Sequence, residues 1–170
     1  MPKKNKGFHC KSEAQKKAIR ANYARRAVRN KGRTASGKVP QGRTLSTYDR
    51  YLPGGKKTGS KKERPVVVIE TNAENDLAVV PLSTRDGSNR THLRNYQQGQ
   101  SYFKHYVEIQ DDEGKPIRVN QKFRENSPKM DVSNKDVGFI KDVIFNHSRP
   151  MQANRKKIDK FHENKKSPRD

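Results

Sequence analysis

The sequence predicts a fold that is mainly β with helices (α+β): a small, strongly bent sheet or barrel closed by a C-terminal helix, with basic extensions at both ends. Three observations lead to this prediction. Short β-branched runs separated by turn residues predict strands, and a later apolar stripe with helical spacing predicts a helix. Nearly all of the excess positive charge lies outside this stretch, in a chain of 170 residues that has room for one domain plus extensions.

The charge distribution divides the chain into three parts. Residues 1–62 hold 19 Lys and Arg against 2 Asp and Glu, a net charge of +17. Residues 63–146 hold 12 against 13, and residues 147–170 hold 8 against 3. We therefore expect a basic arm, a folded domain that is close to neutral, and a basic C-terminal tail, in that order.

The basic arm is expected to contain one helix and a linker. Ser12 followed three positions later by Gln15 is a capping-box pattern, which predicts a helix near 12–30. The apolar stripe of this helix consists mostly of alanine, which buries little surface. We therefore expect the helix to form fully only on a partner, and docking of the helix on the core is the alternative. Residues 31–62 are rich in Gly, Ser, Thr, Pro and Lys and predict a flexible linker.

Two hairpins are expected in the folded domain. The β-branched runs 65–70 and 77–83 flank turn residues and predict the first hairpin. The segments 105–110 and 116–120 flank an acidic turn and predict the second, with the acidic side chains facing solvent. The polar residues 84–104 between the hairpins predict a long loop, which carries several arginines.

A helix is expected at the end of the domain and a weaker one in the tail. Ser133 followed by Asp136 predicts a helix start, and one apolar arc follows it. That arc consists of Val137, Ile140, Val143 and Ile144, with Phe139 at its edge. The arc predicts packing on the sheet. Residues 152–166 predict a last basic helix, with Ile158 and Phe161 three positions apart.

The basic arms point to nucleic acid as the partner. Lys and Arg release counterions when they meet phosphate, which gives strong, salt-sensitive attraction. RNA is the partner we expect, and DNA is the alternative polyanion. The candidate contact residues are Lys16, Lys17, Arg20, Arg25, Arg26, Arg29, Lys61, Lys62, Arg85, Arg90 and Arg94. Without a long apolar run or an apolar block near the N-terminus, we expect a cytoplasmic protein with no membrane partner.

Motifs for nucleotide hydrolysis, dinucleotide binding and zinc chemistry are absent from the sequence, so we expect no cofactor and no metal site. Groups suited to phosphate chemistry are present. Arg64 precedes the first strand of the first hairpin, and Ser83 and Thr84 end the second, so the hairpin is expected to bring the three to one sheet end. Alternatively, Arg64 pairs with a surface carboxylate and Ser83 caps its strand.

A resemblance bears on these residues. The stretch KKERPVVVIETNAENDLAVVPLST, followed later by HYVEIQ, resembles the PemK/MazF-like toxins over about residues 60–145. The resemblance implies an SH3-like, PemK-like β-barrel, usually a homodimer, that cuts single-stranded RNA without metal through attack by a ribose 2′-hydroxyl. It implies Arg64 as acid/base and transition-state stabiliser, Ser83 or its neighbour Thr84 as the assisting hydroxyl, and an antitoxin protein as inhibitor.

Two departures from the family pattern leave other functions open. Lys61 and Lys62 stand where the family carries a loop glutamate, and a strand before residue 63 is present only if residues 43–52 supply it. A non-catalytic module that binds nucleic acid or a ribonucleoprotein is the first alternative, and an inhibitor of a nucleic-acid enzyme is the second. A third uses His92 and His105 as an acid–base pair for RNA cleavage.

Overall fold

The computed structural model describes residues 13–14, 38–55, 62–94, 96, 102–146 and 150–163. The chain divides into two compact units, Met1–Gly37 and Lys38–Asp170. In the first unit only Glu13 and Ala14 are described, and both are helical. The rest of the predicted helix near 12–30 lies outside the described residues.

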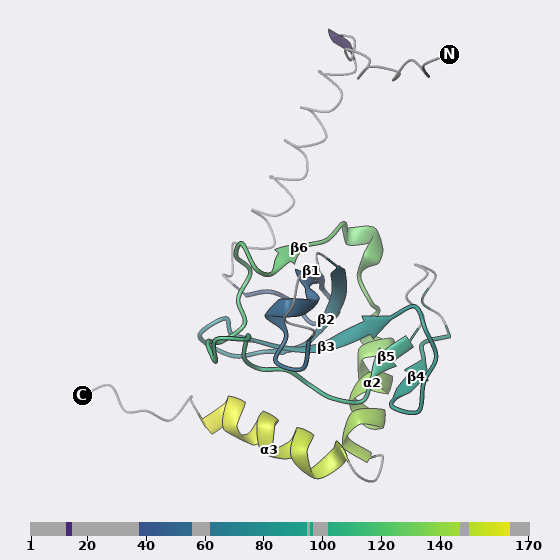
Figure 1. Ribbon diagram of the computed structural model, residues 1–170, viewed down its shortest axis with the longest axis vertical. Coiled ribbons are helices and arrows are strands. Elements are labelled where there is room, and N and C mark those ends of the chain that lie inside the picture. The colour runs from purple at the N-terminus through teal and green to yellow at the C-terminus, as the bar shows by residue number, and fades with distance from the viewer. Residues whose placement is uncertain are drawn as a thin grey trace, which may run out of the picture. The chain divides into compact units, whose positions relative to one another are not determined.

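The second unit combines one antiparallel sheet with helices, which confirms the α+β prediction at this level (Figure 1). The sheet has six strands in the order β4-β5-β3-β2-β1-β6, and within the described residues β4 and β6 are its two open edges. The elements in chain order are β1 (Thr44–Tyr48), the 3₁₀ helix η1 (Asp49–Tyr51), β2 (Glu63–Thr71), β3 (Leu77–Ser83), β4 (Arg90–His92), β5 (Tyr102–Lys104), β6 (Arg124–Glu125), the 3₁₀ helix η2 (Pro128–Met130), α2 (Asn134–Asn146) and α3 (Pro150–Glu163). None of the helices in this described part of the chain has the length and apolarity that a membrane span requires.

The predicted first hairpin is confirmed as β2 and β3. The two strands pair in antiparallel register, with Val66 opposite Pro81 and Val68 opposite Val79. The turn between them is closed by Asn72, whose side-chain oxygen accepts a hydrogen bond of 2.9 Å from the backbone N–H of Asp76. Side-chain bonding of this kind is the reason that Asn and Asp favour turns.

Both faces of this hairpin are buried. Val67 and Ile69 belong to one hydrophobic cluster, while Val66 and Val68 belong to another, as expected for side chains that alternate between the faces of a strand. All seven residues of β3 are buried. Such strands are continuous apolar runs in sequence rather than alternating patterns, which explains why the hairpin was predictable.

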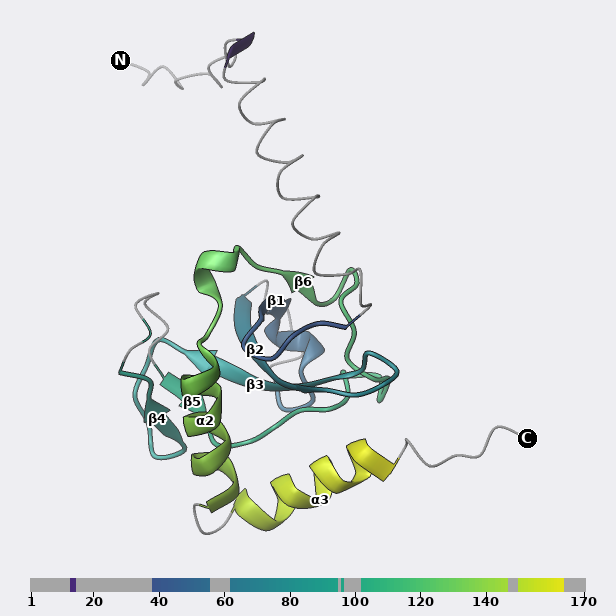
Figure 2. The ribbon, with the colours of Figure 1, turned by 180° about the vertical axis from the view of Figure 1, so that it is seen from behind.

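The predicted helix is confirmed as α2. The hydroxyl of Ser133 accepts a hydrogen bond of 3.1 Å from the N–H of Asp136, as the capping pattern indicated. The buried residues of the helix are those of the predicted apolar arc: Val137, Ile140, Val143 and Ile144. They join the same cluster as Val67 and Ile69, so α2 packs on one face of the hairpin. In both views α2 lies beside the end of the sheet that holds β4 and β5 (Figure 2).

The expected domain boundaries were too narrow at both ends. The folded unit begins at Lys38 rather than near Glu63, because β1 lies inside the segment predicted as linker and pairs along β2. At the other end α3 lies inside the segment predicted as tail, and its Ile158 and Phe161 are buried in the core cluster that contains α2. The last basic helix expected over 152–166 is present as α3, but it belongs to the folded unit rather than to a tail. Residues 43–52 supply the strand before residue 63 as β1. Each of these elements has few large apolar side chains, so its sequence pattern is weak.

Two further predictions need correction. The segment predicted as a long loop over 84–104 contains the short strands β4 and β5, which pair with each other. The predicted second hairpin is reduced to isolated bridges, Gln110 with Pro116 and, toward β3, Glu108 with Val79. The segment 105–110 therefore runs along the hairpin edge without forming a regular strand.

The helix α3 is fixed to the rest of the unit by Asn154, which is buried. Its side-chain nitrogen donates hydrogen bonds of 2.9 Å to the carbonyl oxygens of His105 and Ile144, and its side-chain oxygen accepts one of 3.2 Å from the N–H of Val107. One side chain thus joins α3 to the end of α2 and to the segment beside β3.

We predict that Asn154→Ala lowers the free energy of unfolding by about 3 kcal/mol, because buried backbone groups lose their hydrogen-bond partner. Urea denaturation measures the effect. Gln152→Ala on the exposed face of α3 is the matched control and should change stability by less than about 0.5 kcal/mol. Equal stabilities for the two variants would contradict this role of Asn154.

Candidate functional site

The structure brings together the three residues predicted to act on phosphate. Arg64, Ser83 and Thr84 all line one pocket of about 250 Å³, which we call the Ser83 pocket. Continuing the β2–β3 register beyond the pair Val66 and Pro81 places Arg64 opposite Ser83. The hairpin therefore produces the expected proximity at the end of the sheet.

Three of the predicted nucleic-acid contacts line the same pocket. They are Lys62, Arg85 and Arg90. Arg94 lies elsewhere, in a pocket beside α2. The remaining predicted contacts lie outside the described residues: Lys16, Lys17, Arg20, Arg25, Arg26, Arg29 and Lys61. In the described part of the chain, four cations thus surround the hydroxyls of Ser83 and Thr84, counting Arg64.

The guanidinium of Arg64 is held by an acidic partner at the end of β1. Its Nε donates a hydrogen bond of 2.6 Å to Oδ1 of Asp49, and its Nη1 donates one of 3.3 Å to the carbonyl oxygen of Leu82. The side chains of Arg64 and Asp49 are 13% and 12% exposed. The alternative that Arg64 pairs with a carboxylate is therefore correct, although this carboxylate is largely buried. The same contacts fix the direction in which Arg64 faces the pockets.

Asp49 is positioned by a tight loop that requires glycine. The N–H of Asp49 donates to the carbonyl oxygen of Lys62 at 3.0 Å, which ties η1 to the start of β2. A Cβ atom on Gly55 would lie 1.6 Å from the carbonyl oxygen of Asp49, whereas one on Gly54 would meet nothing within 4 Å. Of the two glycines, only Gly54 leaves room for a side chain.

A second pocket adjoins the first and adds an acid. It has a volume of about 240 Å³, and we call it the Glu108 pocket; its polar lining consists of Asp49, Arg64, Arg90, Lys104, Tyr106 and Glu108. Arg64 and Arg90 line both pockets, so two guanidinium groups stand where the pockets meet. Sequence reasoning missed the contributions of Lys104, Tyr106 and Glu108.

Glu108 is a buried carboxyl with a shifted pKa. Its side chain is 9% exposed, and Nζ of Lys157 in α3 lies 3.6 Å from its Oε2. Burial raises the pKa of Glu108 above its ordinary value, although the nearby charges of Lys157 and Lys104 oppose the shift. A carboxyl with a raised pKa beside cations is a candidate for proton transfer.

The hydroxyls of the Ser83 pocket differ in availability. Ser83 is buried, and its Oγ bonds locally to Arg85, accepting from the N–H at 3.2 Å and donating to the carbonyl oxygen at 3.3 Å. Thr84 is exposed. Arg90 also donates to the carbonyl oxygen of Arg85, at 2.8 Å, and so orders the loop that follows Thr84.

The two histidines of the third alternative do not form a pair. Nε2 of His105 lies 2.6 Å from the hydroxyl of Thr91, whereas the ring of His92 lies against that of Tyr102 with centroids 5.0 Å apart. Thr91 and His92 are consecutive in β4, and consecutive strand residues face opposite sides. The proposed acid–base pair of histidines is therefore wrong.

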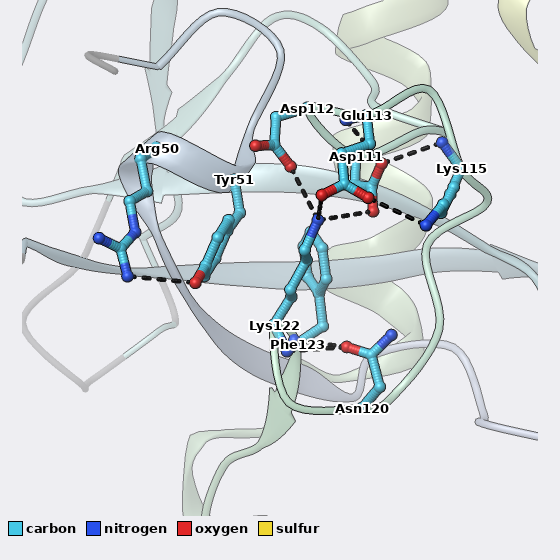
Figure 3. A network of polar contacts seen from close by, with 9 residues as sticks. All are labelled: Arg50, Tyr51, Asp111, Asp112, Glu113, Lys115, Asn120, Lys122 and Phe123. Atoms are coloured by element: carbon cyan, nitrogen blue, oxygen red, sulfur yellow. Dashed lines mark hydrogen bonds and ion pairs between the residues drawn. The ribbon is translucent and has the colours of Figure 1, made fainter. Parts of the chain in front are cut away.

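The acidic turn agrees with expectation at Asp112 and Glu113, which are exposed, whereas Asp111 is buried. Figure 3 shows the polar contacts of this turn. Nζ of Lys122 lies 3.4, 3.2 and 3.1 Å from carboxylate oxygens of Asp111, Asp112 and Glu113. The same Nζ lies 5.2 Å from the centroid of the Tyr51 ring. The backbone carbonyl oxygen of Tyr51 accepts a hydrogen bond of 3.1 Å from the N–H of Asp112. The turn therefore supports η1, the element that carries Asp49.

Within the described ranges, no group of three or more His, Cys, Asp or Glu side chains has an arrangement that would hold a metal ion. Comparisons of the chain with protein-family models, with curated proteins and with solved structures found no match. The resemblance to the PemK/MazF-like toxins therefore depends on the short motifs quoted above.

We predict that Gly55→Ala destabilises the fold by about 1–3 kcal/mol, because the new Cβ would overlap the backbone of Asp49 and force η1 to move. Gly54→Ala has open space around it and should stay within about 0.5 kcal/mol of the parent protein. Thermal and urea unfolding of both variants measure this difference. An unchanged Gly55→Ala would show that η1 does not need this close approach.

Proposed function

We propose that this protein binds RNA and cuts single strands without a metal ion, through attack of a ribose 2′-hydroxyl on the adjacent phosphate. The observation that carries the proposal is the pair of guanidinium groups, Arg64 and Arg90, shared by two adjoining pockets. One pocket supplies the hydroxyl of Thr84 and the other the carboxyl of Glu108. Together they offer charge stabilisation and proton transfer at one place.

The proposed reaction assigns a role to each group. The carboxylate of Glu108 takes the proton from the 2′-hydroxyl, whose oxygen then bonds to phosphorus. Arg64 and Arg90 stabilise the charge that develops on the phosphoryl oxygens. As the bond between phosphorus and the 5′ oxygen breaks, the hydroxyl of Tyr106 donates its proton to this oxygen. Nζ of Lys104, which donates a hydrogen bond of 3.1 Å to the Tyr106 hydroxyl, passes a proton to the tyrosine oxygen in turn. The products are a cyclic phosphate and a free 5′-hydroxyl.

This assignment changes the role that the resemblance implied for Arg64. An arginine side chain stays protonated in proteins and is a poor base, while its planar guanidinium is well suited to bind phosphate. We therefore propose Arg64 as a clamp and leave acid–base chemistry to Glu108. Thr84, being exposed, is the better candidate than Ser83 for the hydroxyl that contacts the substrate.

The finer fold description, an SH3-like barrel closed by a helix, is part of the same proposal. Its support is the run of six antiparallel strands and the burial of both faces of β2 and β3. The open order from β4 to β6 distinguishes the described sheet from a closed barrel. A homodimer and an antitoxin partner are proposed on the resemblance alone.

A non-catalytic RNA-binding module is the second candidate, and the hydrogen bonds of Arg64 favour it. Its Nε and Nη1 donate to Asp49 and Leu82, and the hydroxyl of Ser83 is occupied by Arg85. Because these side chains already bond to groups of the fold, they can stabilise it without taking part in a reaction. Cleavage of RNA by the purified protein in EDTA distinguishes the two functions.

We predict that the protein cuts mixed single-stranded RNA in EDTA and that Arg64→Ala lowers the rate at least about 100-fold, because a phosphoryl charge loses its partner. Gel analysis of 5′-labelled RNA measures the rate. Arg124→Ala is the matched control: it is exposed, it pairs with Glu63, and it should leave cleavage unchanged.

Loss of Arg64 also removes a cation from the largely buried carboxylate of Asp49, so unfolding is measured for the same variant. The double variant Asp49→Asn/Arg64→Gln avoids this charge imbalance and should fold yet remain inactive. Full activity in a folded Arg64 variant would disprove the proposed clamp.

We predict that cleavage rises with pH through the raised pKa of Glu108, above the ordinary value of 4.5, because only the ionised carboxylate accepts the proton. Glu108→Gln should abolish this limb of the pH–rate profile.

The same shift predicts that the free energy of unfolding falls as pH rises above 4.5, since the folded chain binds the proton more tightly than the unfolded chain. Glu108→Gln should remove that fall in the free energy of unfolding. If Glu108→Gln leaves the pH–rate profile of cleavage unchanged, Glu108 is excluded as the base.

A further inference from the structure

A third pocket lies at the edge of the sheet, where β4 faces the first turns of α2. It has a volume of about 490 Å³ and is lined by residues 91–94 and by Lys135, Asp136 and Phe139. Pockets of this size are typical of sites for small organic groups. We call it the Phe139 pocket.

Phe139 is unusual for its exposure. Its side chain is 43% exposed, and the only other large hydrophobic residue exposed to this degree in the described ranges is Val119. The ring meets Phe103 edge to face, with centroids 5.9 Å apart and planes at 87°. The contact with a fully buried ring holds Phe139 at the pocket wall without covering it.

The pocket combines this aromatic surface with charge. Arg94 and Lys135 supply two cations, and Asp136 supplies one carboxylate. The N–H of Asp136 is fixed by the hydroxyl of Ser133 at 3.1 Å, which sets the position of this first turn. An aromatic ring flanked by cations is the combination on which single-stranded nucleic acids bind, the ring stacking on a base and the cations pairing with phosphates. A carboxylate beside them suits the amino group of a base.

The position along β4 connects this pocket to the proposed site of cleavage. Arg90 lines the Ser83 and Glu108 pockets, and His92 lines the Phe139 pocket. Two residues of a strand span about 7 Å, so the pockets follow one another along the sheet edge. That short step suits consecutive nucleotides of one extended strand.

We infer that the Phe139 pocket binds one base of single-stranded RNA, next to the nucleotide whose phosphate meets Arg64 and Arg90. The base stacks on Phe139, and Arg94 and Lys135 pair with its flanking phosphates. The inference rests on the proposed function, because it assigns the neighbouring subsite of the same substrate.

Binding of two fluorescent probes to the full chain tests the subsite. The first is a 2′-O-methyl RNA of about 12 nucleotides, which lacks the attacking hydroxyl and stays intact, and the second is the same backbone without bases. Phe139→Ala should weaken binding of the first probe about tenfold and leave the second unchanged, because only stacking is lost. Phe139→Trp should retain the affinity, and Val119→Ala, the matched exposed apolar control, should equal the parent protein.

The cations have a different signature. Arg94→Ala and Lys135→Ala should each weaken the binding of both probes. Each should also reduce the magnitude of the slope of log affinity against log salt by about one. Wild-type affinity of Phe139→Ala for the first probe would overturn the subsite, as would equal weakening of both probes. Because neither probe can be cut, this result is independent of the cleavage assay. If Phe139→Ala binds the first probe more weakly while the parent protein cuts no RNA, the subsite is supported and the ribonuclease activity is rejected.

Discussion

Burial of both faces of the β2–β3 hairpin is the constraint on which the rest of the structure depends. A strand that is apolar on two sides needs two covers, and the described chain supplies them from different places. The helices α2 and α3 contribute to the cluster around Val67, while β1 and the segment that contains Ile117 and Phe123 contribute to the cluster around Val66. Polar side chains therefore gather at the two ends of the hairpin: Asn72 and Asp76 at the turn, and Arg64 and Ser83 opposite one another at the open end.

Arg43, which precedes β1, and Arg64, which lies in β2, have surroundings that assign them different roles. Arg43 is 2% exposed and lies 3.1 Å from carboxylate oxygens of both Glu125 and Asp131, so its charge is used within the fold. Arg64 has one carboxylate, Asp49, and it lines two pockets. A guanidinium that is oriented by one acid and still faces a pocket retains the capacity to attract an anion. The arrangement separates structural from substrate-directed charge.

The elements that sequence predicted are those with strong apolar patterns. The runs of β2 and β3 and the arc of α2 each contain several large side chains, so their type and their approximate bounds were clear. The proximity of Arg64 to Ser83 followed directly from the hairpin. In contrast, β1 has the sequence TLSTY with one large aliphatic residue, and its place in the sheet comes from pairing with β2. Long-range pairing of this kind leaves little local signal.

The candidate site was predictable only in part for the same reason. Glu108 lies between Val107 and Ile109, and simple alternation places such a residue toward solvent. It is buried instead because α3 lies beside it and brings Lys157 near its carboxylate. Asp49 gains its role from the close approach of Gly55, which residue type alone does not indicate. These features arise from tertiary contacts between segments that the sequence presents as linker and tail.

The shortness of the two outer strands limits how copies of this molecule can associate. β4 offers three residues and β6 only two, and both begin with an arginine. Outer strands of this kind give an incoming backbone too few hydrogen-bonding groups, and their charge discourages stacking of chains into a continuous ribbon. Copies that associate through the described part of the chain are therefore expected to join through side-chain surfaces rather than by extending the sheet.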